Sequence, residues 1–194
     1  MRRSSSLSFN RGVIGLMLTA MAVGLGLGGC SSTDRMGRYN VVVSLSESMR
    51  DPVSRLYRSV EVDLVGVNAA EKSRWDGIDV DAYFAPDGLT RKSEQYSELM
   101  TFTNENPGPK TLSVSSAAWN GWLGPNPRQN NAGIGATQLY VLAKMAKPPS
   151  AAQSDPRLLV LPLSTTKWNN GQRIDIEITP DGLKLLSAPK VEKE

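Results

Sequence analysis

The stretch that decides the fold is LLVLPLSTTKWNNGQRIDIEIT, residues 158–179. In residues 173–179, isoleucines alternate with polar and charged residues, which is typical of a β-strand with one buried and one solvated face. Residues 158–163 are apolar almost throughout and predict a more fully buried strand. Because Asn170-Gly171 is a strong hairpin-turn sequence, we expect these two strands to pair directly as a hairpin.

The same alternation recurs on both sides of this stretch. Further strands are predicted at residues 41–43, 60–65, 78–84, 112–114, 139–142 and 183–186, with turns at Pro86-Asp87-Gly88 and Pro180-Asp181-Gly182. Helical patterns are fewer: we expect short helices within residues 48–57 and 90–100, and one after the capping-box sequence Asn68-Ala-Ala-Glu71. About seven to eight strands with few short helices predict a mostly β domain, an antiparallel β-sandwich.

The N-terminus has the pattern of an export signal. Arg2, Arg3 and Arg11 give it a positive start, and an uncharged apolar run follows at residues 13–27. This run is shorter than the ~20 residues of a membrane-spanning helix but suits the hydrophobic region of a signal peptide. We expect a cleaved signal peptide (1–29), a lipidated tether (30–38), one β-sandwich domain (39–190) and a disordered tail (191–194).

The apolar run ends in Leu27-Gly28-Gly29-Cys30, which resembles the lipobox of bacterial lipoproteins. The resemblance implies cleavage between Gly29 and Cys30, and diacylglycerol and palmitate on Cys30, the only cysteine of the chain. Two or more acyl chains hold a protein stably on a membrane. In that family a serine after the cysteine, here Ser31, implies the outer membrane, with the domain on its periplasmic face, or the cell membrane where there is only one. No other cofactor is expected.

Charge argues against nucleic acid as a partner. The whole chain has 22 basic and 19 acidic residues, but residues 1–29 contain three of the basic residues and none of the acidic ones. The mature protein is therefore formally neutral, and its attachment to a membrane would rest on the lipid anchor instead of electrostatic attraction.

Tryptophan beside asparagine marks a candidate binding surface. Trp119 and Trp122 precede a loop with Asn126 and Asn130, and Trp168 is itself followed by two asparagines. Aromatic faces beside amides suit stacking on sugars, as in a peptidoglycan-binding module, and tryptophan is also frequent at protein interfaces. The alternative is that these rings close the core near strand ends.

Charged clusters give weaker signals. Asp79 and Asp81 would share one face of the strand at residues 78–84, so they are weak candidates for a hard-cation site or else part of a solvated face. Three nearby arginines, Arg50, Arg55 and Arg58, are interleaved with acidic residues and predict a salt-bridged surface. No catalytic residue is assigned, because the chain has no histidine to act as a general base.

A second resemblance concerns the mature domain. The sequence Asp51-Pro-Val-Ser-Arg-Leu-Tyr57, an early alternating strand and the late segment with Leu161-Pro162 and Trp168 are similar to the small β-sandwich lipoprotein of type VI secretion systems. The resemblance implies a domain that hangs from the outer membrane and docks an inner-membrane-anchored partner through a loop. We therefore expect a non-catalytic docking component of a cell-envelope assembly, with a carbohydrate-binding module and a histidine-free hydrolase as alternatives.

Overall fold

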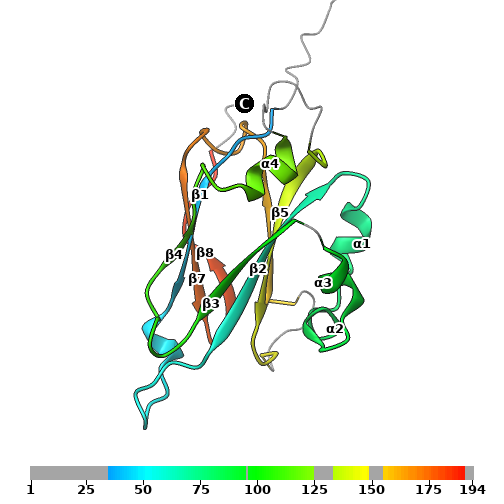
Figure 1. Ribbon diagram of the computed structural model, residues 1–194. Helices are drawn as coiled ribbons and strands as arrows, with labels where there is room; N and C mark the ends of the chain where they lie inside the picture. Colours follow the sequence, from blue (N-terminus) through cyan, green and yellow to red (C-terminus); the bar gives the residue numbers. More distant parts are fainter. Residues whose placement is uncertain (1–34, 95, 125–132, 149–154, 191–194) are drawn as a thin grey trace, which may run out of the picture. The chain divides into compact units, whose positions relative to one another are not determined.

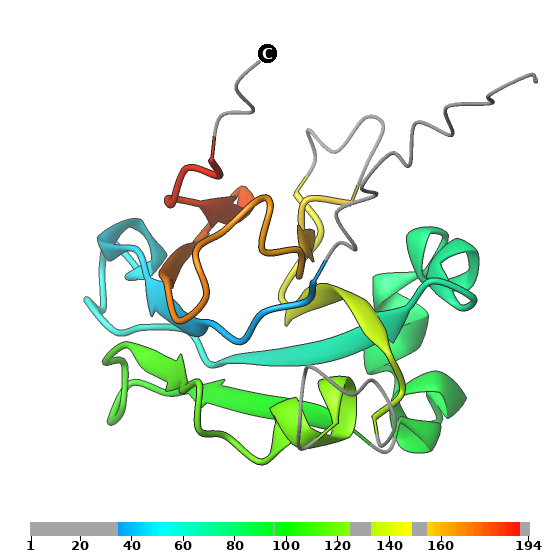
Figure 2. The ribbon, with the colours of Figure 1, turned by 90° about the horizontal axis from the view of Figure 1, so that it is seen from above.

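Eight strands form two four-stranded sheets in the computed structural model, which describes residues 35–94, 96–124, 133–148 and 155–190 (Figure 1). The strands are β1 (Asn40–Leu45), β2 (Val60–Asn68), β3 (Ser97–Phe102), β4 (Lys110–Leu112), β5 (Ala136–Lys144), β6 (Leu158–Pro162), β7 (Arg173–Thr179) and β8 (Gly182–Leu185). The two sheets form the layers seen from above in Figure 2. The prediction of a mostly β sandwich with few short helices is confirmed.

The first sheet has the order β4-β1-β7-β8. Strand β1 pairs antiparallel with β4 but parallel with β7, from Asn40 opposite Arg173 to Leu45 opposite Ile178. The sheet is thus mixed, whereas the sequence predicts antiparallel pairing throughout. The reason is that β1 and β7 are far apart in the chain, so no tight turn fixes their relative direction.

The second sheet has the order β3-β2-β5-β6, and all its pairs are antiparallel. The predicted hairpin between residues 158–168 and 172–179 is therefore wrong, because β6 and β7 belong to different sheets. Trp168 lies between them, fully buried, and its indole N–H donates to the Pro162 carbonyl at 2.9 Å. The segment crosses between the sheets around this ring, and Asn170-Gly171 turns the chain after the crossing. The turn at Pro180-Asp181-Gly182 does close the β7–β8 hairpin, with Thr179 opposite Gly182.

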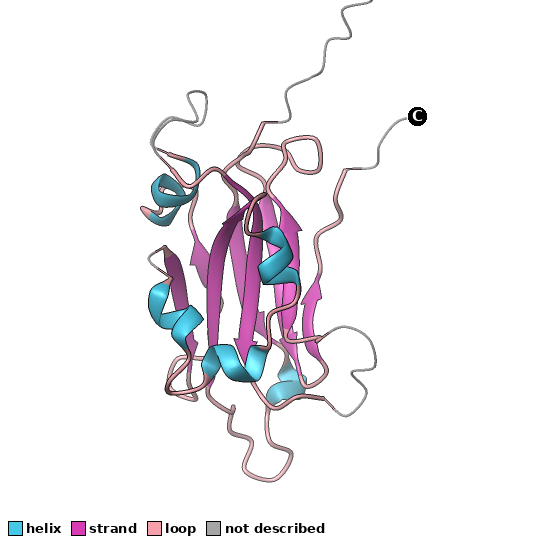
Figure 3. Ribbon diagram, turned by 90° about the vertical axis from the view of Figure 1, so that its right-hand side faces the viewer, coloured by secondary structure: helices cyan, strands magenta, loops and turns pink. Residues whose placement is uncertain are grey.

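Four short α-helices and one 3₁₀ turn connect the strands: α1 (Lys72–Asp76), α2 (Val80–Phe84), α3 (Leu89–Ser93), α4 (Ala118–Leu123) and η1 (Glu47–Met49). Helices α1, α2 and α3 lie on one side of the sandwich, in front of the strands in Figure 3. Helix α1 follows the predicted capping sequence, and Asn68 Oδ1 accepts the Glu71 N–H at 3.0 Å.

The strand predicted at residues 78–84 is wrong, because this segment forms α2. Asp79 is the N-cap residue, and its side chain accepts the N–H groups of Asp81 and Ala82 at 2.9 and 3.2 Å. Val80, Tyr83 and Phe84 are buried. Their i, i+3, i+4 spacing fits a helix face as well as the alternation fits a strand.

The other helix predictions hold only in part. Residues 90–100 contain the end of α3 but also the start of β3, which the sequence did not predict. Residues 48–57 contain only the end of η1, followed by an irregular loop.

The main core fills the space between the sheets and contains three tryptophans with their partner rings. Trp119 and Trp122 from α4 pack edge to face, with ring centroids 5.1 Å apart. Gly66 on β2 makes room for them, because a Cβ at this position would fall 2.4 Å from Trp122 Cγ.

A second, smaller core lies under α1, α2 and α3 on the outer face of β2 and β5. It contains Val65, Val67, Trp75, Val80, Tyr83, Phe84, Tyr140 and Leu142. Residues 60–65 were predicted to have one solvated face, but Asp63 on that face is only 2% exposed. Its carboxylate accepts from the Tyr83 hydroxyl at 2.9 Å and from Arg91 Nε at 2.7 Å. Burial, with the Asp63 charge, raises the pKa of Tyr83, so its hydroxyl stays a donor.

All described residues belong to one compact unit, Thr33–Glu194, and its strands lie between Asn40 and Leu185. Within the described ranges, no helix is long and apolar enough to cross a membrane.

The close approach of Gly66 to Trp122 gives a direct test of the packing. We expect Gly66→Ala to lower the free energy of unfolding by about 1–3 kcal/mol, because the added methyl group would clash with the Trp122 ring in a closely packed core. Urea denaturation measures this as a lower midpoint at unchanged slope. Gly108→Ala is the matched control, since a Cβ there meets nothing within 4 Å. Equal stability of the two variants would contradict the packing.

Candidate docking surface

The connection between β1 and β2 (residues 46–59, the β1–β2 loop) projects beyond the sandwich, at the lower end in Figure 1. It carries two of the large apolar side chains that are exposed to solvent, Val53 at 90% and Leu56 at 51%. Burying such groups against a partner is favourable, and neighbouring exposed apolar residues are typical of an interaction site.

Hydrogen bonds from its own side chains organise the tip of this loop. One Asp51 carboxylate oxygen accepts the N–H groups of Val53 at 3.0 Å and Ser54 at 2.8 Å, and the Ser54 hydroxyl at 3.1 Å. These bonds lower the pKa of the Asp51 carboxyl, the largest contribution coming from the Ser54 N–H. Across the base of the tip, the Asp51 N–H donates to the Leu56 carbonyl at 2.9 Å. The tip is therefore held in one conformation before any partner binds.

The backbone of the tip includes one strained residue. Arg55 has φ +61°, and it is the only residue other than glycine with a positive φ among the described residues. Such a conformation costs of order 1–3 kcal/mol and persists where the surroundings enforce it, often at functional positions.

A cation–π contact and an ion pair join the two ends of the loop at its base. The Arg50 guanidinium lies 4.7 Å from the Tyr57 ring centroid and pairs with Glu47 at 3.0 Å, and the Tyr57 hydroxyl donates to Glu47 at 2.9 Å. The predicted salt-bridged surface is otherwise wrong, because Arg55 and Arg58 have no carboxylate within 4 Å among the described residues. Two of the acidic residues close to them in the sequence, Glu61 and Asp63, pair with Arg91 on another face.

A cavity of about 350 Å³ adjoins the loop. Both ends of the loop line it, together with Met145 and Ala146 after β5 and Pro180 after β7. The loop and the cavity thus share one end of the sandwich. Strand β1 separates this end from residue 40, by roughly 17 Å at the rise of a β-strand.

The predicted tryptophan surface is not formed by the residues that the structure describes. Trp119, Trp122 and Trp168 are all 0% exposed, so none offers a ring face to a sugar or a partner. Each indole N–H donates to a backbone carbonyl, of Ser113, Tyr96 and Pro162 respectively. The alternative interpretation, core packing, holds for the three rings because they fill the space between the sheets. Asn126 and Asn130 lie outside the described residues.

Asp79 and Asp81 do not form a cation site. Asp79 caps α2, whereas Asp81 accepts from Arg157 Nη1 at 2.5 Å and Nη2 at 3.0 Å. Arg157 is 2% exposed and also pairs with Asp155 at 2.7 Å, so its guanidinium lowers the pKa of both carboxyls. Across the described ranges, no group of three or more His, Cys, Asp or Glu side chains is placed to hold a metal ion.

Two Ser-x-x-Lys spacings, at residues 164–167 and 187–190, bear on the hydrolase alternative. Ser164 Oγ lies 2.5 Å from Thr166 Oγ1, and Ser187 Oγ accepts the Asp175 N–H at 2.8 Å. Lys190 Nζ donates to the Thr165 carbonyl at 2.7 Å. These hydrogen bonds hold the crossover between the sheets and the end of the described chain in place. Gly29 and Cys30 lie outside the described residues.

Of the comparisons with known proteins, only the one with solved structures finds matches, and it identifies the fold of this chain. No protein-family model and no curated protein matches the chain. Among solved structures, a chain described as "Type VI membrane complex" matches with a TM-score of 0.51 at 15% identity, over 79% of this chain and 100% of that one. Lip of Serratia marcescens, "a membrane bound component of the Type VI Secretion System", gives a TM-score of 0.47 at 12% identity, over 78% of this chain and 98% of Lip.

The chain is therefore a small β-sandwich with the fold of a chain from a type VI membrane complex. This confirms, at the level of fold, the resemblance to type VI secretion lipoproteins expected from the sequence.

The sequence pointed to this loop only indirectly. The stretch Asp51–Tyr57 was singled out for its resemblance, but its exposed apolar residues were not predicted as a surface. A signal was available, because Val53 and Leu56 lie in a polar, proline-containing segment without the alternation of a strand.

The hydrogen bonds of Asp51 give a test of loop order. We expect Asp51→Ala to speed amide hydrogen exchange at Val53 and Ser54 several-fold, without changing exchange in the strands, because the two N–H groups lose their acceptor. Asp181→Ala, in the β7–β8 turn, is the control. Since the folded-state pKa of Asp51 is lowered, the protection is present above its ordinary value near 3.8 and is lost as pH falls through the lowered one. Unchanged exchange in Asp51→Ala would show that the tip is ordered by other contacts.

Proposed function

We propose that this protein is a lipid-anchored, non-catalytic docking component of a type VI secretion membrane complex, and that the β1–β2 loop binds its protein partner. The observation that carries the proposal is the loop itself, in which Val53 and Leu56 are exposed to solvent on a tip ordered by hydrogen bonds. The shared fold with a chain of a type VI membrane complex supports the choice of assembly.

The geometry of the loop suits binding to a protein. A preformed loop loses little conformational entropy on binding, so more of the energy of apolar burial appears as affinity. Val53 and Leu56 would supply apolar anchors, surrounded by the polar residues of the same loop.

The proposed lipid anchor at Cys30 determines which way the loop faces relative to the membrane. The described chain enters the sandwich ahead of β1, and β1 leads from that end to the loop. An anchor upstream of β1 would leave the loop at the far end of the sandwich, where a partner from the opposite membrane would meet it. The location that we propose for this arrangement is the periplasmic face of the outer membrane.

The glycan alternative loses its main support, because the three tryptophans proposed for stacking are buried.

Site-specific photo-crosslinking in cells tests the docking surface. We expect a photoreactive residue at position 53 or 56 to crosslink to a component of the type VI membrane complex, identified by mass spectrometry. Position 186 is the matched control, because Leu186 is 51% exposed, as is Leu56, but lies after β8. Leu56→Asp should weaken the association at least about tenfold, as expected for an interface anchor, and Leu186→Asp should not. Crosslinks to position 186 alone, or none to such a component, would contradict the proposal.

Replacement of the anchor cysteine tests the membrane attachment. We expect Cys30→Ser to abolish palmitate labelling and to move the protein from the membrane fraction to the soluble periplasmic fraction, because no acyl chains can then be attached. Ser31→Ala should leave both unchanged. A Cys30→Ser variant that stays in the membrane fraction would contradict the lipid anchor.

A further inference from the structure

A second cavity, of about 450 Å³, lies among the three short helices on the outer face of the second sheet (the α1–α3 cavity). It is lined by residues of α1, α2, α3 and the turns between them. Figure 1 shows these helices at the side of the sandwich, whereas the β1–β2 loop lies at its end. The cavity is thus separate from the proposed docking loop.

The walls of the cavity are largely apolar. The apolar lining consists of Trp75, Ile78, Ala82, Tyr83 and Leu89. Leu89 is 80% exposed, although leucine in a folded protein gains from burial. An apolar group that enters the cavity would cover this side chain.

One buried polar group in this region has no partner. The Trp75 indole is 1% exposed, and its Nε1–H is one of two buried side-chain polar atoms without a hydrogen bond among the described residues, the other being Arg38 Nε. The three other indoles donate to carbonyls, and the nearby hydroxyls of Tyr83 and Tyr140 donate to Asp63 and Asp76. Because Trp75 also lines the cavity, its indole N–H is a spectroscopic reporter of what enters there.

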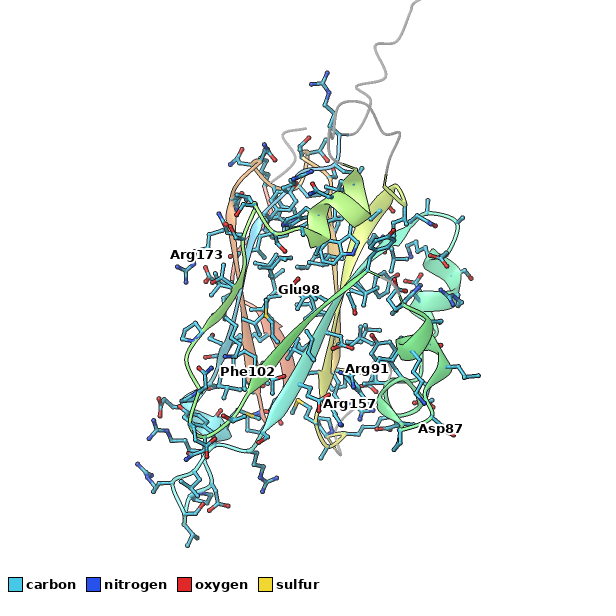
Figure 4. All side chains as sticks on the ribbon, in the orientation of Figure 1. Asp87, Arg91, Glu98, Phe102, Arg157 and Arg173 are labelled. Atoms are coloured by element: carbon cyan, nitrogen blue, oxygen red, sulfur yellow. The ribbon has the colours of Figure 1, made fainter. Side chains whose placement is uncertain are left out.

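The rim of the cavity is acidic. Asp79 and Asp87 line it and form no salt bridge with any described residue, whereas the one lining cation, Arg74, is already paired with Glu71 at 2.8 Å. Figure 4 labels Asp87 beside the turn between α2 and α3, at the outer margin. The rim therefore favours a positively charged group.

From the apolar walls and the acidic rim we infer that the α1–α3 cavity is a second binding site, which takes an apolar side chain carried next to a cationic group on a peptide segment of a partner protein. The apolar side chain fills the cavity beside Trp75 and Leu89, and the cation lies against Asp87. This site does not depend on the β1–β2 loop.

Nuclear magnetic resonance of the full ¹⁵N-labelled chain tests this site, because each tryptophan gives a separate indole N–H signal. The probe is phenylalaninamide, which combines an aromatic side chain, a carbonyl and an ammonium group. N-acetyl-phenylalaninamide is the matched probe without the charge. The Trp75 indole signal is assigned by its loss in the Trp75→Phe variant. We expect a saturable shift of the Trp75 indole signal, because Trp75 lines the cavity. The signals of Trp119, Trp122 and Trp168 should not move, because these rings lie in the core between the sheets.

Three variants separate this site from weak general binding. The charged probe should bind roughly two- to fivefold more tightly than the acetylated one, and Asp87→Asn should remove that difference. Ala82→Leu should weaken binding about tenfold by filling the cavity, and Ala82 is exposed, so the variant should fold normally. Leu89→Lys, also at an exposed position, should weaken the charged probe by repulsion. A Trp75 signal that does not move, or that moves equally in Ala82→Leu, would overturn the proposal.

Discussion

Burial of β2 on both faces is the constraint on which the rest of the structure depends. One face supplies Val60, Val62 and Leu64 to the core between the sheets, and the other supplies Val65 and Val67 to the core under the three helices. A strand with both faces covered needs a layer on each side, and the short helices α1, α2 and α3 provide the outer one. Helices of this length are marginal in isolation. Packing against β2 and β5 holds α1 and α2 in place, whereas α3 has no buried residue and is tied to β2 by the ion pairs of Arg91.

Double burial also explains the polar groups of this region. Asp63 cannot reach water, so it is satisfied by Tyr83 and Arg91, which come from two different helices. Removing Arg91 would leave the buried Asp63 charge without its ion-pair partner. The Tyr83 hydrogen bond and the Arg91 ion pair therefore fix the positions of α2 and α3, and with them the shape of the α1–α3 cavity. On the other face, Gly66 lets Trp122 close the core.

The sequence predicts most strands because their alternation reflects which face is buried. It fails where a local pattern has two readings or where partners are distant. Residues 78–84 alternate like a strand, but the Asp79 cap and the spacing of Val80, Tyr83 and Phe84 serve a helix. Asn170-Gly171 predicts a hairpin, yet Trp168 is drawn into the core and the chain crosses to the other sheet. The parallel pairing of β1 with β7 joins segments with no local link.

The candidate site is less predictable than the fold for a related reason. Tryptophan is equally suited to a core and to an interface, and composition cannot choose between them; here the core takes Trp119, Trp122 and Trp168. The exposed Val53 and Leu56 become informative only when the loop is seen to be ordered and to project from the sandwich.

We propose that the β1–β2 loop is the surface by which this protein joins its assembly. Hydrogen–deuterium exchange of the chain alone and within the membrane complex purified through it measures this directly. We expect new protection at residues 46–59 and at Met145 and Ala146 beside the loop, with exchange in α4, at the other end of the sandwich, unchanged. Protection confined to other faces, with exchange at residues 46–59 the same in both states, would contradict it.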